Sequence, residues 1–108
     1  MGAVGEQFVS VMYPNEGSEF DMGYYLGTHG SLVRGKWDSL GLKSLKVIKG
    51  LATSDPDTLP PCQLIALLEF GSVEESQAAV ADSGDEVLGD IPNFTDIQPV
   101  IQVNTKIE

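Results

Sequence analysis

The alternation of hydrophobic and polar positions along the chain predicts four β-strands. Residues 7–13 are rich in β-branched and aromatic side chains and are followed by Pro14, which indicates a first strand and its exit turn. Residues 42–51 alternate apolar side chains with lysine and serine, the pattern of a half-exposed strand. Residues 62–70 are apolar at nearly every position, so we expect both faces of that strand to be buried. Residues 97–106 predict the last strand.

A helix is predicted between the first two strands, over residues 18–29. Ser18 can cap its N-terminus, and Asp21 lies in the first turn, where the helix dipole favours an acidic side chain. Two internal glycines lower the helix propensity and indicate that another backbone or a ligand approaches closely. Gly30 is expected to end the helix in the left-handed conformation, before a partly helical connection over residues 31–41.

A second helix is predicted after the third strand, from a capping box at residues 72–75 to a stop near residues 82–84. Residues 53–61 form a turn-rich connection that is too short for a crossover helix, so the second and third strands should pair antiparallel. The order βαββαβ predicts an α+β, ferredoxin-like fold, in which two helices cover one face of a four-stranded antiparallel sheet. We expect residues 1–108 to form a single domain.

The other face of this sheet needs a cover. A strand that is apolar on both faces would leave a large hydrophobic patch in water. A chain of 108 residues is also small, and such domains bury only about two thirds of their unfolded surface. We therefore predict a homodimer in which two copies pack their uncovered sheet faces together.

Charge and composition narrow the range of partners and locations. The formal net charge is −10, from 16 acidic and 6 basic residues, which argues against a nucleic-acid partner. No apolar run approaches the roughly 18 residues that span a bilayer, and no leader pattern opens the chain, so we expect no membrane partner and a cytoplasmic location. Cys62 is the only cysteine, which excludes an internal disulfide, and its apolar neighbours predict a core position.

The basic residues are clustered in one segment, which contains Arg34, Lys36, Lys43, Lys46 and Lys49. Two interpretations are open. The cluster can be a solvated edge that offsets acidic neighbours. It can also be a cationic rim that draws an anionic or carbonyl-bearing small molecule toward a cleft.

The single histidine, His29, is the main candidate for proton transfer, because imidazole is the side chain that titrates nearest neutrality. Helical spacing places Asp21, Tyr25 and His29 on one broad face. Tyr25 could orient the imidazole or polarise a substrate oxygen, and Asp21 could hold an adjacent group, so these three are the candidate catalytic residues. The alternative is a structural histidine that interacts with the negative end of the helix dipole.

Four sequence segments carry a resemblance to a known family: Tyr13-Pro14, Phe20-Asp21-x-x-Tyr24-Tyr25-Leu26-x-x-His29-x-x-Leu32-Val33, Leu68-Glu69-Phe70-x-Ser72 and Ile91-Pro92-Asn93-Phe94. The tyrosine pair followed by histidine is the most specific part. On these residues the chain resembles, over nearly its whole length, the EthD family of the dimeric α+β barrel superfamily, named from a bacterial ethyl tert-butyl ether degradation cluster. The chain departs from the family in having Gly30-Ser31 where a proline commonly follows the histidine, which implies a looser helix end.

The resemblance implies that two copies pair as a dimeric α+β barrel around small-molecule sites. The candidate ligand-binding residues are Tyr13, Tyr24, Trp37, Asn93 and Phe94. The aromatic side chains could instead form core, with Trp37 as a packing anchor. One histidine and no closely spaced set of cysteine, histidine or carboxylate leave too few ligands for a transition metal. We expect no cofactor; haem on His29, with Trp37 and Asn93 beside it as in haem-degrading relatives, is the alternative.

The function implied by the resemblance is binding of a small apolar, oxygen-bearing metabolite in a degradation pathway of the ether type. Its transformation would use cofactor-free proton-transfer or oxygenase chemistry at His29. The alternative is a non-enzymatic binding or accessory protein for a partner oxygenase system. The fold does not choose between an enzyme and a binding protein.

Overall fold

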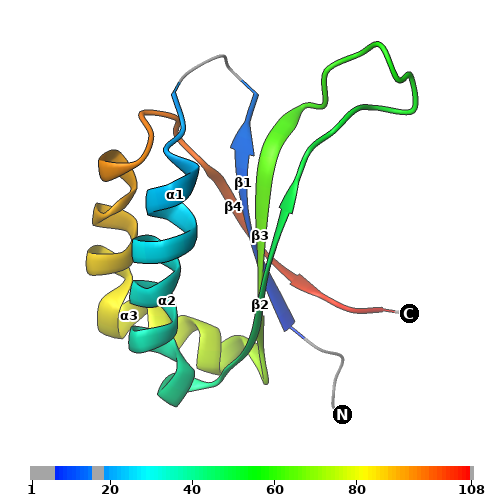
Figure 1. Cartoon of the computed structure of the whole chain (residues 1–108). Coiled ribbons are helices and arrows are strands. Elements are labelled where there is room, and N and C mark those ends of the chain that lie inside the picture. Colours follow the sequence, from blue (N-terminus) through cyan, green and yellow to red (C-terminus); the bar gives the residue numbers. More distant parts are fainter. Residues whose placement is uncertain (1–6, 16–18, 108) are drawn as a thin grey trace.

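A computed structural model describes residues 7–15 and 19–107 of the chain. Figure 1 shows two layers, one of helices and one of strands, with the connection between β2 and β3 extending away from both. The elements in chain order are β1 (Gln7–Pro14), α1 (Met22–Tyr24), the π-helical turn η1 (Tyr25–His29), α2 (Gly30–Trp37), the 3₁₀ turn η2 (Asp38–Leu40), β2 (Leu42–Lys49), β3 (Cys62–Phe70), α3 (Val73–Gly89), the 3₁₀ turn η3 (Ile91–Asn93) and β4 (Val100–Thr105).

The four strands form one antiparallel sheet in the order β2-β3-β1-β4. The two halves of the chain interleave, because β1 lies between β3 and β4. Both long helical segments, α1 to α2 and α3, lie on the same side of this sheet (Figure 1). The predicted α+β, ferredoxin-like βαββαβ fold is therefore confirmed.

The first helical segment begins and ends at residues other than those predicted. Asp21 is its N-cap, and the carboxylate accepts a hydrogen bond from the Tyr24 amide at 3.0 Å. Ser18, the predicted cap, lies outside the described residues. The helix also continues through Gly30, whose φ of −59° is right-handed, so the predicted stop there is wrong. The left-handed residue is Gly41, with φ of 108°, and it ends the segment just before β2.

The helix α3 starts as predicted but runs further. The Ser72 hydroxyl caps it by accepting from the Glu75 amide at 3.1 Å. The predicted stop near residues 82–84 is wrong, because Ser83 produces a kink with φ −142° and ψ 17° and the helix then continues. The Trp37 indole N–H bridges to this kink, donating to the Ala79 carbonyl at 3.0 Å and to the Ser83 hydroxyl at 2.9 Å. These two hydrogen bonds from Trp37 stabilise the kinked backbone of α3 at the point where the local sequence predicts that the helix ends.

The central strand β3 is buried on one face only within a single chain. The side chains toward the helices are buried, and the apolar side chains of the opposite face, Ile65 and Leu67, are half-exposed. The prediction that both faces are buried is therefore not met by one copy of the chain. Cys62, at the start of β3, is half-buried rather than in the core. The last strand is also shorter than the predicted 97–106.

The register places further apolar side chains on the face away from the helices. Ile65 lies opposite Met12 of β1 and Ile48 of β2, and Met12 lies opposite Val100 of β4. Ile48 and Val100 are 48% and 53% exposed. One apolar row thus crosses all four strands on the face that no helix covers. Such a face is unusual on a soluble monomer.

Candidate functional site

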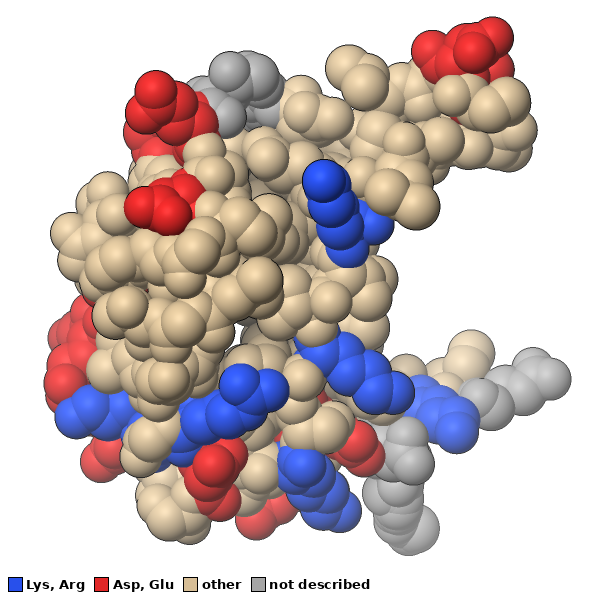
Figure 2. Space-filling model, viewed as in Figure 1, with Lys and Arg blue, Asp and Glu red and all other residues tan. Residues whose placement is uncertain are grey.

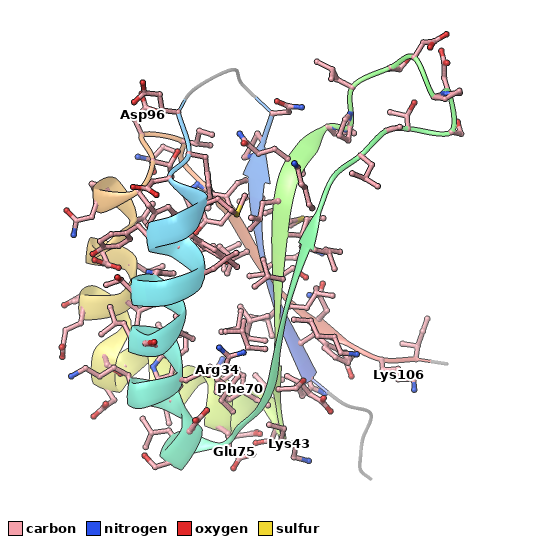
Figure 3. The ribbon with its side chains drawn as sticks, in the orientation of Figure 1. Arg34, Lys43, Phe70, Glu75, Asp96 and Lys106 are labelled. Carbon is pink, nitrogen blue, oxygen red and sulfur yellow. The ribbon has the colours of Figure 1, made fainter. Side chains whose placement is uncertain are left out.

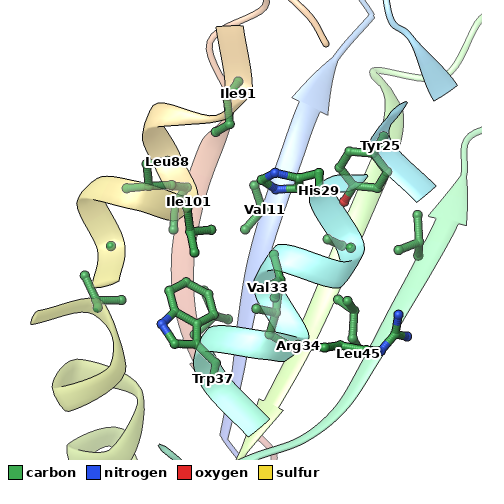
Figure 4. A pocket seen from close by; sticks show the side chains of 18 of the residues that line it. Val11, Tyr25, His29, Val33, Arg34, Trp37, Leu45, Leu88, Ile91 and Ile101 are labelled. Atoms are coloured by element: carbon green, nitrogen blue, oxygen red, sulfur yellow. The ribbon is translucent and has the colours of Figure 1, made fainter. Parts of the chain in front are cut away.

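A cavity of about 320 Å³ lies between the helical layer and the sheet. Figure 4 shows its lining side chains projecting from both layers, with Val33 and Trp37 on α2, Leu45 on β2 and Leu88 on α3. Nearly all of the lining is aliphatic or aromatic. Its volume and character are those of sites that bind small organic molecules. The cavity is formed within one chain.

The few polar side chains of the lining come mainly from one turn of helix. His29 and Tyr25 both belong to the π-helical turn η1, in which the Gly30 amide donates to the Tyr25 carbonyl five residues back. Their rings stack with centroids 5.3 Å apart and an interplanar angle of 27°. Single π-helical turns are frequent at functional sites, because they re-aim side chains relative to a regular helix.

His29 is held by a carboxylate that the sequence did not single out. Its Nδ1 lies 2.9 Å from Oδ2 of Asp90, the residue that follows α3. The two side chains are only 7% and 11% exposed. Phe94 packs on the imidazole, with ring centroids 4.8 Å apart. The ring is therefore fixed in position, as a catalytic imidazole must be.

The second oxygen of Asp90 is also occupied. Its Oδ1 accepts from the Tyr24 hydroxyl at 2.6 Å and from the Asn93 amide at 2.9 Å. Burial raises the pKa of Asp90, but the hydrogen bonds from Tyr24, Asn93 and His29 favour the charged form, and the net effect is a lowered pKa. Asp90 is thus an anion whose two oxygens are fully used, one of them on His29.

The other imidazole nitrogen, Nε2 of His29, has no hydrogen-bond partner among the described residues. Every enclosed polar side-chain atom of those residues has a partner, so Nε2 must face open space, and His29 lines the cavity. In the neutral ring, a donor Nδ1 on the Asp90 carboxylate leaves the lone pair on Nε2. The arrangement of an anchored Nδ1 and an available Nε2 is that of a general base in histidine-dependent enzymes.

Two phenol groups and the side chain of Arg34 are the other polar groups of the lining. Tyr13, on β1, and Tyr25 meet edge to face with ring centroids 6.0 Å apart. Burial raises the pKa of Tyr25 to about 12, and burial together with the neighbouring Tyr25 raises that of Tyr13 further. Neither hydroxyl bonds to another described residue, neither is fully enclosed, and both residues line the cavity. At neutral pH they are protonated and available to a ligand oxygen.

Of the other predicted site residues, Trp37 lines the cavity and Asp21, Tyr24, Asn93 and Phe94 do not. Asp21 is exposed and caps the helix, and no contact joins it to His29, so the structure does not bring all three candidate catalytic residues together. Tyr24 and Asn93 lie behind Asp90 and do not line the cavity. Trp37 lines it with its ring, while its N–H is bonded to α3. Phe94 contacts His29 but not the cavity.

Asp90 is the residue that sequence reasoning missed. It lies 61 positions from His29, and no local pattern joins them. The available signal was its position directly before Ile91-Pro92-Asn93-Phe94, a segment that the family resemblance includes. A search for acidic residues next to that segment would have found it.

The described residues contain neither a cluster of metal ligands nor a membrane-spanning helix. Within residues 7–15 and 19–107, no three His, Cys, Asp or Glu side chains gather in a way that could hold a metal ion. The polar groups proposed to accompany a haem on His29 are used elsewhere, since Asn93 donates to Asp90 and the Trp37 N–H to α3. Among the described helices, none combines the length and the apolar character that crossing a bilayer requires.

The fold and the cavity together define a class: small ferredoxin-like α+β proteins with an apolar ligand site between helices and sheet. An EthD-like protein from Ralstonia eutropha is 36% identical, with TM-score 0.88 over 98% of this chain and 96% of its own. An ethyl tert-butyl ether degradation (EthD) family protein from Bacillus halodurans is 18% identical, with TM-score 0.72 over 96% and 100% of the two chains. The present chain belongs to the EthD-like family.

More distant similarities show the fold alone. A candidate monooxygenase from Shewanella loihica is 13% identical, with TM-score 0.63 over 99% of each chain. No protein-family model matches the sequence. No functionally curated protein matches it either.

Proposed function

We propose that this protein binds a small apolar, oxygen-bearing molecule in the cavity and that His29, oriented by Asp90, exchanges a proton with it. One observation carries the proposal: Nδ1 of His29 is fixed at 2.9 Å from a buried carboxylate while Nε2 opens on an apolar cavity. The alternative of a histidine at the negative end of a helix dipole does not apply, because the helical segment continues past His29 to Trp37.

The chemistry follows from the groups that face the ligand. Nε2 takes a proton from an acidic C–H or O–H of the ligand, and the resulting imidazolium is stabilised by Asp90. The charge that develops on the ligand oxygen is stabilised by the hydroxyls of Tyr13 and Tyr25, which remain protonated because their pKa values are raised. General base catalysis of this kind typically contributes about 10²- to 10⁴-fold. Oxygenase chemistry would begin with the same deprotonation, with dioxygen as co-substrate.

Deuterium exchange tests the proton transfer directly. Apolar ketones and esters are incubated with the protein in heavy water, and exchange of the C–H next to the carbonyl is followed by NMR. Binding is followed separately by the fluorescence of Trp37, the only tryptophan, which lines the cavity. We expect His29→Gln to abolish exchange and to change binding little.

Each other outcome has a defined meaning. Saturable binding without exchange by the unaltered protein would favour the second candidate, a non-enzymatic binding or accessory protein. Exchange that His29→Gln leaves unchanged would refute the role of this residue. Absence of any binding would refute the ligand site as a whole.

We also propose that the protein is a homodimer that pairs through the uncovered sheet face, as a dimeric α+β barrel. The apolar row that includes Ile65, Ile48 and Val100 supports this, since burying roughly 800 Å² per partner is typical of stable interfaces. The ether-type degradation pathway and the cytoplasmic location belong to the same proposal. They rest on the family and on the single cysteine.

A further inference from the structure

We infer that the molecule bound in this cavity carries a carboxylate, which pairs with Arg34 at the mouth of the cavity. This inference rests on the proposed ligand site and narrows its ligand to a hydrophobic organic acid. Figure 4 shows Arg34 at one end of the cavity, where α2 approaches Leu45 of β2.

The charge of the lining differs from the charge of the protein. The chain carries 16 acidic and 6 basic residues, yet no carboxylate lines the cavity, and Arg34 is its only lysine or arginine. Figure 2 shows a hollow between the helical layer and the sheet with basic side chains beside and below it, and acidic side chains further below and at the outer edges. An isolated cation beside an apolar volume in an acidic protein favours anionic ligands.

Arg34 has no ionic partner among the described residues, unlike its neighbour on α2. Lys36 pairs with Glu86 of α3 at 2.8 Å, and it does not line the cavity. Lys46 lies opposite Leu67 and therefore on the sheet face away from the helices. Of the five clustered basic residues, Arg34 alone is thus placed beside the cavity and left available to a ligand. Its planar guanidinium suits a carboxylate, which it binds through two parallel hydrogen bonds.

The distance from Gly30 shows where the guanidinium lies. Gly30 lies one turn before Arg34 and lines the cavity, and a Cβ at Gly30 would lie 3.8 Å from Nη1 of Arg34. The side chain of Arg34 therefore folds back along α2 over the residue that follows His29. Figure 3 shows Arg34 on the side of α2 that faces the sheet.

This placement gives the ligand an orientation. Its carboxylate lies at the mouth with Arg34, and its apolar body enters the cavity beside Val33, within reach of His29.

Matched neutral and charged probes test the inference. Phenylbutanoate and phenylbutanamide have nearly the same shape, and binding of each is measured by calorimetry to the full-length protein, to Arg34→Met and to Lys36→Met. The two substitutions remove the same charge from the same helix. We expect the unaltered protein to prefer the carboxylate, and Arg34→Met to weaken it by about tenfold or more while leaving the amide unchanged. Lys36→Met should change both by less than about threefold.

The outcomes distinguish the two levels of the proposal. If the amide binds as tightly as the carboxylate, or if both variants weaken the carboxylate equally, the role of Arg34 is refuted and the cavity remains a ligand site. If neither probe binds to any form, the ligand site itself fails and this inference with it. Circular dichroism of each variant, compared with the unaltered protein, verifies that loss of binding is not loss of folding.

Discussion

Replacement of Asp90 by asparagine measures how much the protein depends on the buried carboxylate behind His29. The carboxylate accepts three hydrogen bonds, from His29, Tyr24 and Asn93. An asparagine side chain keeps one oxygen and places an NH₂ group against a donor, so at least one bond to a charged acceptor is lost. Such bonds are worth about 1.5–3 kcal/mol.

Asp90→Asn is expected to lower the free energy of unfolding by about 2–3 kcal/mol. The hydrogen bond to buried His29 contributes most of this, because solvent weakens the bonds to Tyr24 and to exposed Asn93. For a domain of this size that corresponds to a fall in Tm of about 10–20 °C. Asp96→Asn is the matched control. Asp96 is exposed and makes no hydrogen bond or ion pair among the described residues, so its replacement should change stability by less than about 0.5 kcal/mol.

The assay is urea unfolding followed by Trp37 fluorescence and circular dichroism, at several pH values. Because the folded pKa of Asp90 is lowered, its contribution is present above the pKa of an unfolded aspartate, about 3.9, and is lost as the pH falls through the folded pKa. The difference between the unaltered protein and Asp90→Asn should therefore be largest near neutrality and shrink in acid. Equal stabilities of Asp90→Asn and Asp96→Asn at pH 7 would refute the reasoning.

Three further predictions concern other parts of the molecule. All three tyrosines have raised pKa values. Ultraviolet titration should therefore show few tyrosinates in the folded protein at about pH 10, the pH at which half of the tyrosines of the urea-unfolded chain are ionised. Half-ionisation of the folded protein at that pH would contradict this prediction. Gly35→Ala should raise the free energy of unfolding by up to about 1 kcal/mol, because a Cβ at this helical position meets no other atom. Gly41→Ala should lower the free energy of unfolding by about as much, because the φ of Gly41 is 108°. Chemical denaturation measures both changes, and changes of the same sign would contradict the prediction. Leu67→Lys on the uncovered sheet face should convert a dimer to monomers in light scattering, and a monomeric unaltered protein would overturn the proposed pairing.

The fold was predictable from the sequence because strand and turn signals are local. The strands predicted at 7–13, 42–51 and 62–70 match the structure within one or two residues at each end, and the capping box at Ser72 is present. The errors lie where tertiary contacts override local propensity. Glycine often ends a helix, yet Gly30 is helical here and α2 continues beyond it. The stop signal near Ser83 becomes a kink, and the indole of Trp37, on another helix, bonds to it.

The candidate site was predictable only in part. His29 and Tyr25 were found because both lie on one helical segment and their residue types suit proton transfer. Asp90 was missed because its partner is 61 positions away and the packing of α3 against α2 brings the two together, so only its place beside Ile91-Pro92-Asn93-Phe94 marked it. Asp21 was predicted to be near His29 because helical spacing puts the two on one face of the helix. In the structure its carboxylate instead caps the helix by accepting from the Tyr24 amide.

The enclosure of the cavity within one chain sets the stoichiometry of binding. The lining side chains of the described residues all belong to one chain, so saturation is expected at one equivalent per chain. A mixture of unaltered and Arg34→Met chains should then contain sites of two affinities, in the ratio in which the chains were combined.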